Sequence, residues 1–552
     1  MMRADSAFAC IAPELAAFQS AGVFTPAETM FAETIHRLAP NEPWQALLAA
    51  ALAMRAPRQS AVSVDLSTVT TSIDVYDLAT PSAERTDIDA ADLVANLPWP
   101  DAAEWRTLLR ASSVVADEHA DKNDPRPLVL VGDRLYLDCF WRDEQFVAAE
   151  LSRRAELPAA DWAVSFDAAA IAGLSAEQQQ AVRMVLSSSL TVLTGGPGTG
   201  KTRVVAEAIR VLADGNPNVR VRLAAPTGKA AARLAEAIGQ HGEIVSLEPP
   251  TTLHRLLGMG PRHRARRVID ADMVVVDECS MVALPLMAEL LASLADDTRL
   301  VLVGDANQLP SVEAGTVFVD AVQRATTPGD PLCNRGIQLT YNHRSAAAPG
   351  IAALAEAILA RNGMGIAAAM QLDGVSQFDR PNEVREVVLA AALEMHRAAA
   401  AGDVAGALAA LRSVRVLCAH RRGPDGVGAW NARVERWLRA AVPGLRIDGW
   451  YVGRPILVTK NDPINGLHNG DMGVVMGGAL ADRVAIDGRA EPIHTVQLAN
   501  VETVHAMTVH NAQGSEFDTV VVVPAQPGSP LGNPQLLYTA ITRAKARVAV
   551  KS

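Results

Sequence analysis

TVLTGGPGTGKTRVVAEA, residues 191–208, places four glycines and a lysine between an apolar run and a helix-forming segment. Residues 191–194 are β-branched or apolar and predict a short buried strand, and residues 204–209 predict the first turns of a helix. The loop between them fits G-x-x-x-x-G-K-[ST], whose glycines let successive backbone N–H groups turn toward a phosphate. The positive end of the following helix adds to this attraction. The stretch therefore predicts a phosphate-binding loop, with Lys201 directed to the β/γ-phosphates and Thr202 to Mg²⁺.

Length and composition predict a multidomain globular protein. The chain has 552 residues, which corresponds to about three to four domains. Hydrophobic residues make up 49% and charged residues 20%, unlike a disordered protein. The five cysteines form no C-x-x-C pair, so neither a zinc site nor a disulfide framework is expected. The longest uncharged segment, residues 519–542, holds four prolines, so we expect no membrane span and a cytoplasmic protein with reduced cysteines. The net charge of −11 argues against nucleic-acid binding over the whole surface but allows a local groove.

The first 165 residues differ in pattern from the rest of the chain. They hold five of the eight tryptophans and no recognisable catalytic pattern. Helical periodicity is plausible for residues 13–38 and 44–54. RPLVLVGDRLYLDCFW, residues 126–141, predicts a β-hairpin that turns at Gly132-Asp133. This part therefore predicts a mixed, mainly helical domain.

From residue 166 onward, continuous Val/Leu runs alternate with Ala-rich helical stretches, which is typical of parallel sheets buried on both faces. We expect one α/β domain at 166–335 and a second at 336–552. Residues 447–504 break the rhythm with glycines and short Val/Ile runs, and predict a small β-barrel inserted in the second α/β domain. The strands expected in the two sheets are Leu190–Thr194, Val221–Ala225, Met273–Val276, Arg299–Val303, Val414–Ala419 and Thr519–Val523.

An acidic pair follows a second buried strand in MVVVDECS, residues 273–280. A phosphate loop needs an acid that holds the metal and a residue that aims the attacking water. Asp277, at the end of the strand, is placed to hold Mg²⁺, and Glu278 is placed to polarise a water against the γ-phosphate. The pair therefore predicts nucleotide hydrolysis in addition to binding.

Further polar residues complete this pattern along the chain. VGDANQLPSVEAG, residues 303–315, follows a third strand and places Gln308 to sense the phosphate. LTYNHR places Arg344 between the two α/β halves, and LLYTAITRAK brings Arg543 from the second half. Loop arginines that close on a γ-phosphate from across a cleft contribute about 10³–10⁵ in rate.

Together these motifs resemble those of superfamily 1 helicases, and their fuller forms resemble the RecD branch, the alpha subunit of exodeoxyribonuclease V. The resemblance covers about residues 166–552, and it covers the first 165 residues more loosely, chiefly at RLYLDCFWRDEQ. The stretches that carry it are GGPGTGKT, APTGKAAARL, TLHRLLG, DECSMV, GDANQLPSVEAG, CAHRRGPDGVGAWN, NGDMGVV, TVHNAQGSEFD and YTAITRAK.

The resemblance implies a fold and an activity. The fold is α/β, with two RecA-like parallel-sheet P-loop domains, an inserted SH3-like β-barrel and the mainly helical N-terminal domain as a partner-docking part. The activity is that of an ATP-dependent helicase that moves 5′ to 3′ on single-stranded DNA, with ATP and Mg²⁺ as cofactors. It implies the motor subunit of a RecBCD-type helicase–nuclease, with RecB-like and RecC-like partners, which acts on DNA ends in double-strand-break repair and recombination.

Site residues carry over by position. The adenine-reading glutamine falls on Gln178, the coupling glutamine on Gln308, and the two γ-phosphate arginines on Arg344 and Arg543. The acidic pair falls on Asp277 and Glu278, of which Asp277 binds the metal together with Thr202. The nucleotide contacts are Gly195, Gly196, Pro197, Gly198, Thr199, Gly200, Lys201, Thr202, Gly514 and Glu516. The single-stranded-DNA contacts are Pro226, Thr227, His254, Thr508 and His510.

The sequence departs from the family pattern at a few places. Asn511-Ala512 stands where lysine and serine are frequent, which predicts a weaker DNA or phosphate contact. Cys279 stands where alanine is usual, which we expect to be harmless. The chain ends nine residues after Arg543, so the last strand of the second sheet is expected to be short.

Other functions stay open at the level of the sequence. One is a stand-alone RecD-like helicase or the helicase half of a relaxase, although the first 165 residues show neither helix-hairpin-helix repeats nor a tyrosine and histidine cluster. Another is a subunit that has lost hydrolysis, against which the intact site residues argue. A nuclease is disfavoured because no Glu-x-Lys or Asp-x-Lys tripeptide occurs, so a nuclease centre is expected in a partner. The residues themselves do not give the polarity of movement or the activity of the isolated chain.

Overall fold

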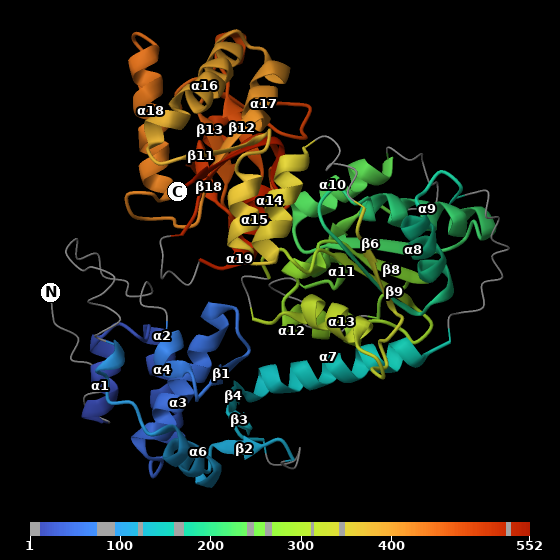
Figure 1. Ribbon diagram of the computed structural model, residues 1–552, viewed down its shortest axis with the longest axis vertical. Helices are drawn as coiled ribbons and strands as arrows, with labels where there is room; N and C mark the ends of the chain where they lie inside the picture. Colours follow the sequence, from blue (N-terminus) through green and yellow to red (C-terminus); the bar gives the residue numbers. More distant parts are fainter. Residues whose placement is uncertain are drawn as a thin grey trace. The chain divides into compact units, whose positions relative to one another are not determined.

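The computed structural model describes residues 12–73, 94–119, 125–158, 171–239, 248–259, 268–310, 314–341, 348–525 and 532–552 (Figure 1). The chain forms two compact units. The first comprises Met1–Arg153, Val282–Ala292 and Pro310–Val317, and the second comprises Arg154–Met281, Ser293–Leu309 and Phe318–Ser552. None of the helices in these described ranges is long and apolar enough to cross a bilayer.

The first unit packs helices against a small four-stranded sheet. Trp105 and Phe18 are fully buried in its core, and the sheet has the order β1-β4-β3-β2. Gly315 N–H donates to Ser60 O at 3.2 Å, which joins the segment 310–317 to this unit. Its elements are α1 (Pro13–Ser20), α2 (Pro26–Leu38), α3 (Trp44–Arg55), a 3-10 turn (Ala56–Gln59), β1 (Ser63–Asp65), α4 (Val69–Ser72), α6 (Ala102–Ala111), β2 (Val115–Asp117), β3 (Leu128–Val131), β4 (Arg134–Leu137), most of α7 (Asp138–Glu156) and α12 (Leu284–Ala292).

The predicted hairpin is present, and the first predicted helix is divided in two. β3 and β4 pair antiparallel, and Gly132 in their turn has a φ of +58°, which glycine adopts without strain. The helical pattern at 13–38 breaks at Gly22, whose φ is +77°. The second helix then begins at Pro26 with a capping box between Thr25 and Glu28, so local capping overrides the continuous apolar period.

The second unit begins with a six-stranded sheet in the order β10-β5-β9-β8-β6-β7, in which every neighbouring pair is parallel. All residues of β5 and β9 are buried, as expected for central strands covered on both faces. β10 begins at residue 336, where the second domain was predicted to start, and it pairs with β5. The elements are α8 (Ala176–Ser187), β5 (Leu190–Gly195), α9 (Lys201–Gly215), β6 (Val221–Ala225), α10 (Gly228–Gly239), β7 (Thr251–Thr252), α11 (Leu253–Leu256), β8 (Met273–Val276), a 3-10 turn (Cys279–Met281), β9 (Arg299–Gly304), α13 (Val317–Thr326) and β10 (Gly336–Leu339).

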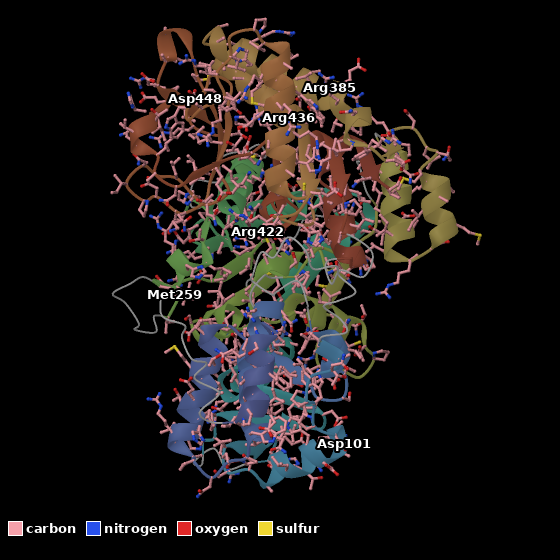
Figure 2. The ribbon with its side chains drawn as sticks, turned by 90° about the vertical axis from the view of Figure 1, so that its left-hand side faces the viewer. Asp101, Met259, Arg385, Arg422, Arg436 and Asp448 are labelled. Atoms are coloured by element: carbon pink, nitrogen blue, oxygen red, sulfur yellow. The ribbon has the colours of Figure 1, made fainter. Side chains whose placement is uncertain are left out.

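A second parallel sheet follows, in the order β11-β20-β19-β12-β18. The strand after Arg543 is β20, which has eight residues and pairs with β19 on one side and β11 on the other, so the prediction of a short last strand was wrong. Helices α16 and α18 pack together around Trp430 and Trp437, and Figure 2 shows Arg385 and Arg436 on these two helices. The elements are α14 (Pro349–Leu359), α15 (Gly363–Ala369), β11 (Val375–Phe378), a 3-10 turn (Pro381–Val384), α16 (Arg385–Ala400), α17 (Val404–Ser413), β12 (Val414–Cys418), α18 (Val427–Ala441), β18 (Ala506–Thr508), a 3-10 turn (His510–Ala512), β19 (Phe517–Val523), α19 (Pro534–Ile541) and β20 (Ala544–Lys551).

The predicted β insertion is a five-stranded antiparallel sheet in the order β16-β15-β14-β13-β17. One face packs on the second parallel sheet's core, and the other has its own core around Ile456 and Val484. Two parallel sheets, a β insertion and a mainly helical first unit confirm the predicted fold class. The strands of the insertion are β13 (Pro455–Val458), β14 (Met472–Val475), β15 (Arg483–Ile486), β16 (Ile493–His494) and β17 (Val501–Thr503), with 3-10 turns at Gly478–Leu480 and Thr495–Gln497.

Candidate nucleotide site and DNA contacts

The glycine-rich loop joins the buried strand β5 to the first turn of α9, as its sequence predicts. Gly198 and Gly200 have φ values of +82° and +87°, a backbone conformation that side chains disfavour. The Lys201 ammonium donates to the carbonyls of Gly195 at 2.6 Å and Gly196 at 3.1 Å, so it lies back against its own loop. The loop therefore has the tight turn and the helix N-terminus that a phosphate site requires.

Gln178 is 2% exposed and lies against the underside of this loop. Its Oε1 accepts the Ser175 N–H at 3.2 Å, which caps α8, and its Nε2 donates to Thr199 O at 3.1 Å. A Cβ on Gly200 would collide with the same amide, so glycine is required there. In this structure Gln178 supports the shape of the loop, and its predicted contact with adenine stays a prediction.

The acidic pair lies at the end of β8, as predicted. Asp277 Oδ1 accepts the Glu278 N–H at 2.8 Å, and Glu278 has a φ of +53°, which costs energy for a residue with a side chain. Burial raises the pKa of Asp277 to about 6, the negative charge of Glu278 adds to this, and Lys201 opposes it. Strained backbone and two adjacent carboxyl groups beside the phosphate loop are typical of a functional site.

Gln308 and Arg543 are both buried, with exposed fractions of 5% and 3%. Gln308 Nε2 donates to Asp305 Oδ2 at 3.1 Å. Arg543 Nε donates to Thr539 O at 3.1 Å, so the guanidinium is held on the last turn of α19. Each of these two predicted site residues is thus held by a hydrogen bond to a nearby residue of its own domain.

A cavity of about 320 Å³ brings most of the predicted nucleotide residues together. It lies between elements of the two parallel sheets of the second unit. Its predicted lining residues are Pro197, Gly198, Gly200, Lys201, Thr202, Asp277, Glu278, Gln308, Glu516 and Arg543. Gly196 and Thr199 instead line an adjoining cavity of about 320 Å³, which shares Pro197 with the first. Gly514, with a φ of +67°, lies in the turn two residues before Glu516 and lines neither.

Arg344 lies outside the described residues. The segment that leads to it is held in place by Glu177 of α8, whose carboxylate accepts the Thr340 N–H at 2.9 Å and the Tyr341 N–H at 3.3 Å. These bonds, together with one from the Thr340 hydroxyl, lower the pKa of Glu177, the hydroxyl being the main cause. The predicted role of Arg344 stays a prediction.

Arg233 lines the same cavity and was missed by the sequence reasoning. Among the residues that the structure describes, it makes no hydrogen bond or ion pair. Desolvation by the surrounding protein lowers the pKa of Arg233; the charge of Arg543 adds to this, and the charges of Glu516 and Glu278 oppose it. Part of the Arg233 side chain is exposed to solvent. Its position in APTGKAAARL was a usable signal, because this motif forms helix α10, which lines the cavity together with the phosphate loop.

The predicted DNA contacts lie at the carboxyl ends of parallel strands, where open α/β sheets bind their ligands. Pro226 and Thr227 follow β6, and Thr227 Oγ1 accepts the Ala230 N–H at 3.2 Å. His254 is exposed on α11, just after β7. Thr508 ends β18, and burial lowers the pKa of His510 after it, so this histidine is neutral near pH 7.

Lys229, two residues after Thr227, joins three parts of the second unit. Its ammonium donates to Ser515 Oγ at 2.7 Å, in the second parallel sheet's domain, and to Gly470 O at 3.2 Å, in the β insertion. A Cβ on the preceding Gly228 would collide with the imidazole of His468 in the insertion. The predicted DNA-contact segment is therefore packed against the insertion.

The two departures from the family pattern have simple surroundings. Cys279 is fully buried, and its Sγ donates to Val276 O at 3.3 Å. Asn511 is exposed and its N–H donates to Thr508 Oγ1 at 3.3 Å, while Ala512 is fully buried in the core. Only Asn511 of these is free to meet a ligand.

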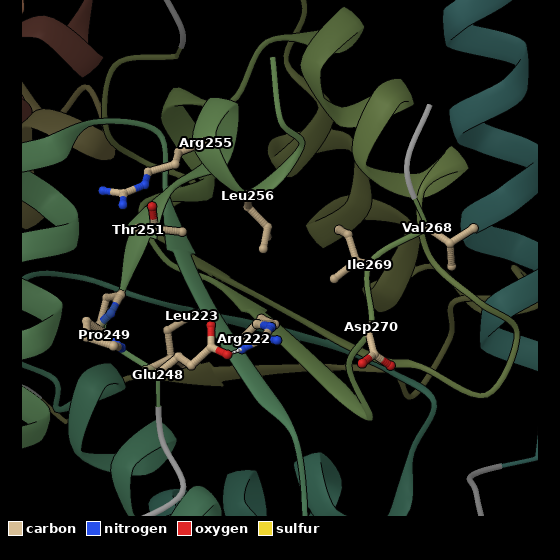
Figure 3. A pocket seen from close by; sticks show the side chains of 11 residues that line it. Arg222, Leu223, Glu248, Pro249, Thr251, Arg255, Leu256, Val268, Ile269 and Asp270 are labelled. Atoms are coloured by element: carbon tan, nitrogen blue, oxygen red, sulfur yellow. Dashed lines mark ion pairs between the residues drawn. The ribbon is translucent and has the colours of Figure 1, made fainter. Parts of the chain in front are cut away.

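A further cavity, of about 440 Å³, lies beside the edge strand β7 (Figure 3). Arg222 and Glu248 form an ion pair along it, and Leu223, Leu256 and Ile269 give it an apolar side. It contains none of the residues predicted to bind nucleotide or DNA, so the sequence motifs do not assign it a role.

Known families match three parts of this chain. Residues 20–136 match the N-terminal domain of RecBCD enzyme subunit RecD, residues 178–314 match an AAA domain, and residues 503–550 match the UvrD-like helicase C-terminal domain. Among solved structures, Bacteroides Pif1 bound to single-stranded DNA has a TM-score of 0.39 and 18% identity, over 68% of this chain and 92% of that chain. That likeness is too low to support a functional argument.

Curated relatives give the family. RecBCD enzyme subunit RecD of Mycolicibacterium smegmatis is 41% identical over 96% of this chain and 93% of its own length. The subunit of the same name from Mycobacterium tuberculosis is 40% identical over 97% and 92%. The ATP-dependent RecD2 DNA helicase of Deinococcus radiodurans is 34% identical over 75% of this chain but only 54% of its own length. The chain therefore belongs to the RecD family and is a superfamily 1, ATP-dependent DNA helicase.

Proposed function

We propose that the chain is the motor of a RecBCD-type helicase–nuclease, which moves 5′ to 3′ along single-stranded DNA and takes part in double-strand-break repair and recombination. The observation that carries the proposal is the cavity of about 320 Å³, because it gathers Lys201, Glu278 and Arg543 from two parallel sheets. A non-hydrolysing structural subunit has no need for this arrangement.

Hydrolysis follows from what each side chain offers. Lys201 and the N–H groups of the loop bind the β/γ-phosphates. Glu278 polarises the attacking water and accepts its proton. Arg543, and Arg344 beyond the described residues, stabilise the charge that develops on the γ-phosphate. When the γ-phosphate leaves, the arginines lose their anionic partner, and the two α/β domains are free to separate.

The donor set fits a magnesium ion. The Thr202 hydroxyl and the Asp277 carboxylate are oxygen ligands that line the same cavity. The raised pKa of Asp277 reflects burial and the nearby charge of Glu278, a repulsion that a cation offsets. Thr202 and Asp277 would hold the ion, and a bound Mg²⁺ would neutralise negative charge on the nucleotide's phosphates.

The partners are inferred from the extent of the match. The chain covers more than nine tenths of two RecBCD subunits but about half of a RecD2 helicase. The first 136 residues include a match to the RecD N-terminal domain. These matches support a docking role of the first unit toward RecB-like and RecC-like chains, which would supply the nuclease centre.

The first test is ATP hydrolysis by the purified chain, with and without single-stranded DNA, beside Lys201→Ala and the control Arg210→Ala, a half-buried arginine of α9 that does not line the cavity. We expect DNA-stimulated hydrolysis that Lys201→Ala abolishes and Arg210→Ala leaves intact. If the isolated chain does not hydrolyse ATP, the same measurement is made with RecB-like and RecC-like partners. If the complex does not hydrolyse ATP either, the assignment of the hydrolytic site is contradicted.

Polarity and substrate need a second assay. Displacement of streptavidin from a biotin at either end of a single-stranded oligonucleotide reports the direction of movement. We expect ATP-dependent displacement from the 3′ end, toward which a 5′-to-3′ motor runs. Displacement from the 5′ end alone contradicts the proposed polarity but leaves the hydrolytic site in place.

A further inference from the structure

The loop after β9 contacts the second parallel sheet's domain at three points. Tyr538 Oη donates to Asp305 Oδ2 at 3.0 Å. The Leu309 N–H donates to Thr539 Oγ1 at 2.9 Å, and Gln513 Nε2 donates to Leu309 O at 3.2 Å. Residues more than 200 positions apart in sequence are thus joined by direct hydrogen bonds.

Asp305 is shared between this contact and the nucleotide site. The same Oδ2 that accepts the Tyr538 hydroxyl also accepts Gln308 Nε2 at 3.1 Å. Asp305 is 1% exposed and Tyr538 is 5% exposed, so water does not replace a lost partner easily. Burial, with the charge of Asp305 as a further cause, raises the pKa of Tyr538, so its hydroxyl remains a donor across the physiological pH range.

The other end of this contact leads to Arg543. Arg543 Nε donates to the carbonyl of Thr539, the residue next to Tyr538 in α19. One turn of α19 therefore anchors the guanidinium in the cavity and, through Asp305, fixes the amide of Gln308 in the same cavity. The hydroxyl of Tyr538 also lies 3.1 Å from where a Cβ on Gly196 of the phosphate loop would be.

We propose that Tyr538 is a positioning residue for ATP hydrolysis. By holding Asp305 it sets the amide of Gln308 in a fixed relation to Arg543, so that both groups reach the γ-phosphate together. This inference rests on the proposed function, because it assumes that Gln308 and Arg543 act on ATP. It adds Tyr538 and Asp305 to the hydrolytic apparatus, neither of which the motif reading assigned a role.

The test is Tyr538→Phe, which removes one oxygen and keeps the ring. We expect kcat of DNA-stimulated ATP hydrolysis to fall about tenfold, while KM for ATP and the affinity for a non-hydrolysable ATP analogue change by less than about twofold. A merely structural role predicts a loss of analogue affinity and of thermal stability in step with kcat.

A double-mutant cycle with Gln308→Ala tests the route of the effect. If Tyr538 acts through Gln308, adding Tyr538→Phe to Gln308→Ala lowers kcat by less than about twofold more, because the group it positions is already gone. Independent effects multiply, and a further tenfold loss in the double variant overturns the proposal.

Tyr451→Phe is the matched control. Its hydroxyl is also buried in the second sheet's domain, where it donates to Glu435 Oε1 at 3.1 Å and lies 3.0 Å from His505 Nε2. We expect its kcat to match that of the unmodified protein. An unmodified protein without DNA-stimulated hydrolysis contradicts the proposed function, whereas a stimulated protein whose Tyr538→Phe variant equals the control overturns this inference alone.

Discussion

Arg233 is a cation of the nucleotide cavity that makes no hydrogen bond or ion pair within the described part of the chain. Three carboxyl groups line the cavity with it, on Asp277, Glu278 and Glu516, and a triphosphate brings further negative charge to this place. A guanidinium binds phosphate oxygens through charge-assisted hydrogen bonds that are stronger than neutral ones. Arg233 is therefore a candidate ligand of the nucleotide, on the same helix that begins at the predicted DNA contacts.

We expect Arg233→Ala to raise KM for ATP about tenfold, which corresponds to about 1.4 kcal/mol, and Arg233→Lys to recover part of the loss. The control is Arg397→Ala, because Arg397 is exposed and pairs only at the surface with Glu394 at 3.1 Å. Steady-state ATP hydrolysis with saturating DNA measures both. An unchanged KM in Arg233→Ala contradicts a contact with the nucleotide.

Residues within one motif were predictable, whereas residues brought together by folding were not. Lys201 and Thr202 follow from a local loop pattern, since the eight positions 195–202 determine the turn and the helix start. Tyr538 and Asp305 are 233 positions apart, and no spacing rule connects them. Gln178 was predicted to read adenine, which stays a prediction. Its two amide contacts, with Ser175 and Thr199, depend on the packing of α8 beneath the loop, which the sequence does not specify.

The segment that links β6 to α10 packs on the β insertion. Gly228 opens α10, and a Cβ there would collide with the His468 imidazole. Since alanine is favoured over glycine in a helix by about 1 kcal/mol, intrinsic propensity predicts stabilisation by Gly228→Ala. Packing predicts the opposite sign.

We expect Gly228→Ala to lower the free energy of unfolding by about 1–3 kcal/mol, the usual range for overpacking. His468→Ala in the same chain removes the obstacle and should restore stability. Gly239→Ala, at the other end of α10 with nothing near its Cβ position, is the control and should be neutral or slightly stabilising. Denaturant unfolding measures all four proteins. If Gly228→Ala lowers the free energy of unfolding equally in the presence and in the absence of the His468 side chain, the insertion does not pack on this segment in solution.

The free energy of unfolding is expected to depend on pH through Lys229, which joins α10 to the β insertion and to Ser515. Burial lowers the pKa of Lys229 from 10.5 to about 8, Arg233 on the same helix and Arg415 add to this, and Asp471 and Asp487 oppose it. Between these two values the folded protein has lost a proton that the unfolded chain still holds. The unfolded state binds more protons there, so the contribution of Lys229 to the free energy of unfolding rises with pH.

Lys229→Met removes this titration. We expect the free energy of unfolding of the unmodified protein, relative to Lys229→Met, to increase by up to about 3 kcal/mol between pH 8 and pH 10.5. Below pH 8 the difference should be flat, because the lysine is charged in both states. Chemical denaturation at several pH values gives the difference directly. A flat difference across the whole range means that the Lys229 ammonium is solvated in the folded protein.

The bounds of long strands were predictable from the sequence, whereas very short strands were not. The central strands were predicted to within a residue or two, because uninterrupted Val/Leu runs between helices have few other solutions. β7 has two residues and β16 has two, and neither is long enough to produce a pattern. β10 was not predicted as a strand. It begins at the predicted start of the second domain but pairs with β5 of the first parallel sheet, a long-range contact that no local pattern indicates.

For the whole molecule, an acidic chain is expected to bind an acidic ligand. The net charge is −11, and the five predicted DNA contacts are Pro226, Thr227, His254, Thr508 and His510, among which there is no lysine or arginine. Burial lowers the pKa of His510, so it adds no charge near pH 7. Hydroxyls, backbone N–H groups and helix N-termini that bind DNA phosphates release few counterions, whereas basic side chains that bind them release more.

We therefore expect the affinity for single-stranded DNA to depend weakly on salt. For single strands each neutralised phosphate contributes about −0.7 to the slope of log K against log salt concentration, so a slope shallower than about −2 is expected, equivalent to fewer than about three charge contacts. Fluorescence anisotropy of a labelled oligo-dT between 50 and 200 mM salt, about the physiological range, measures it. The Thr227→Ala variant should lower affinity equally at every salt concentration, because it removes an uncharged contact. A slope steeper than about −4 would mean that lysines and arginines outside the predicted set carry most of the binding, and that the motif residues serve chiefly to orient the strand.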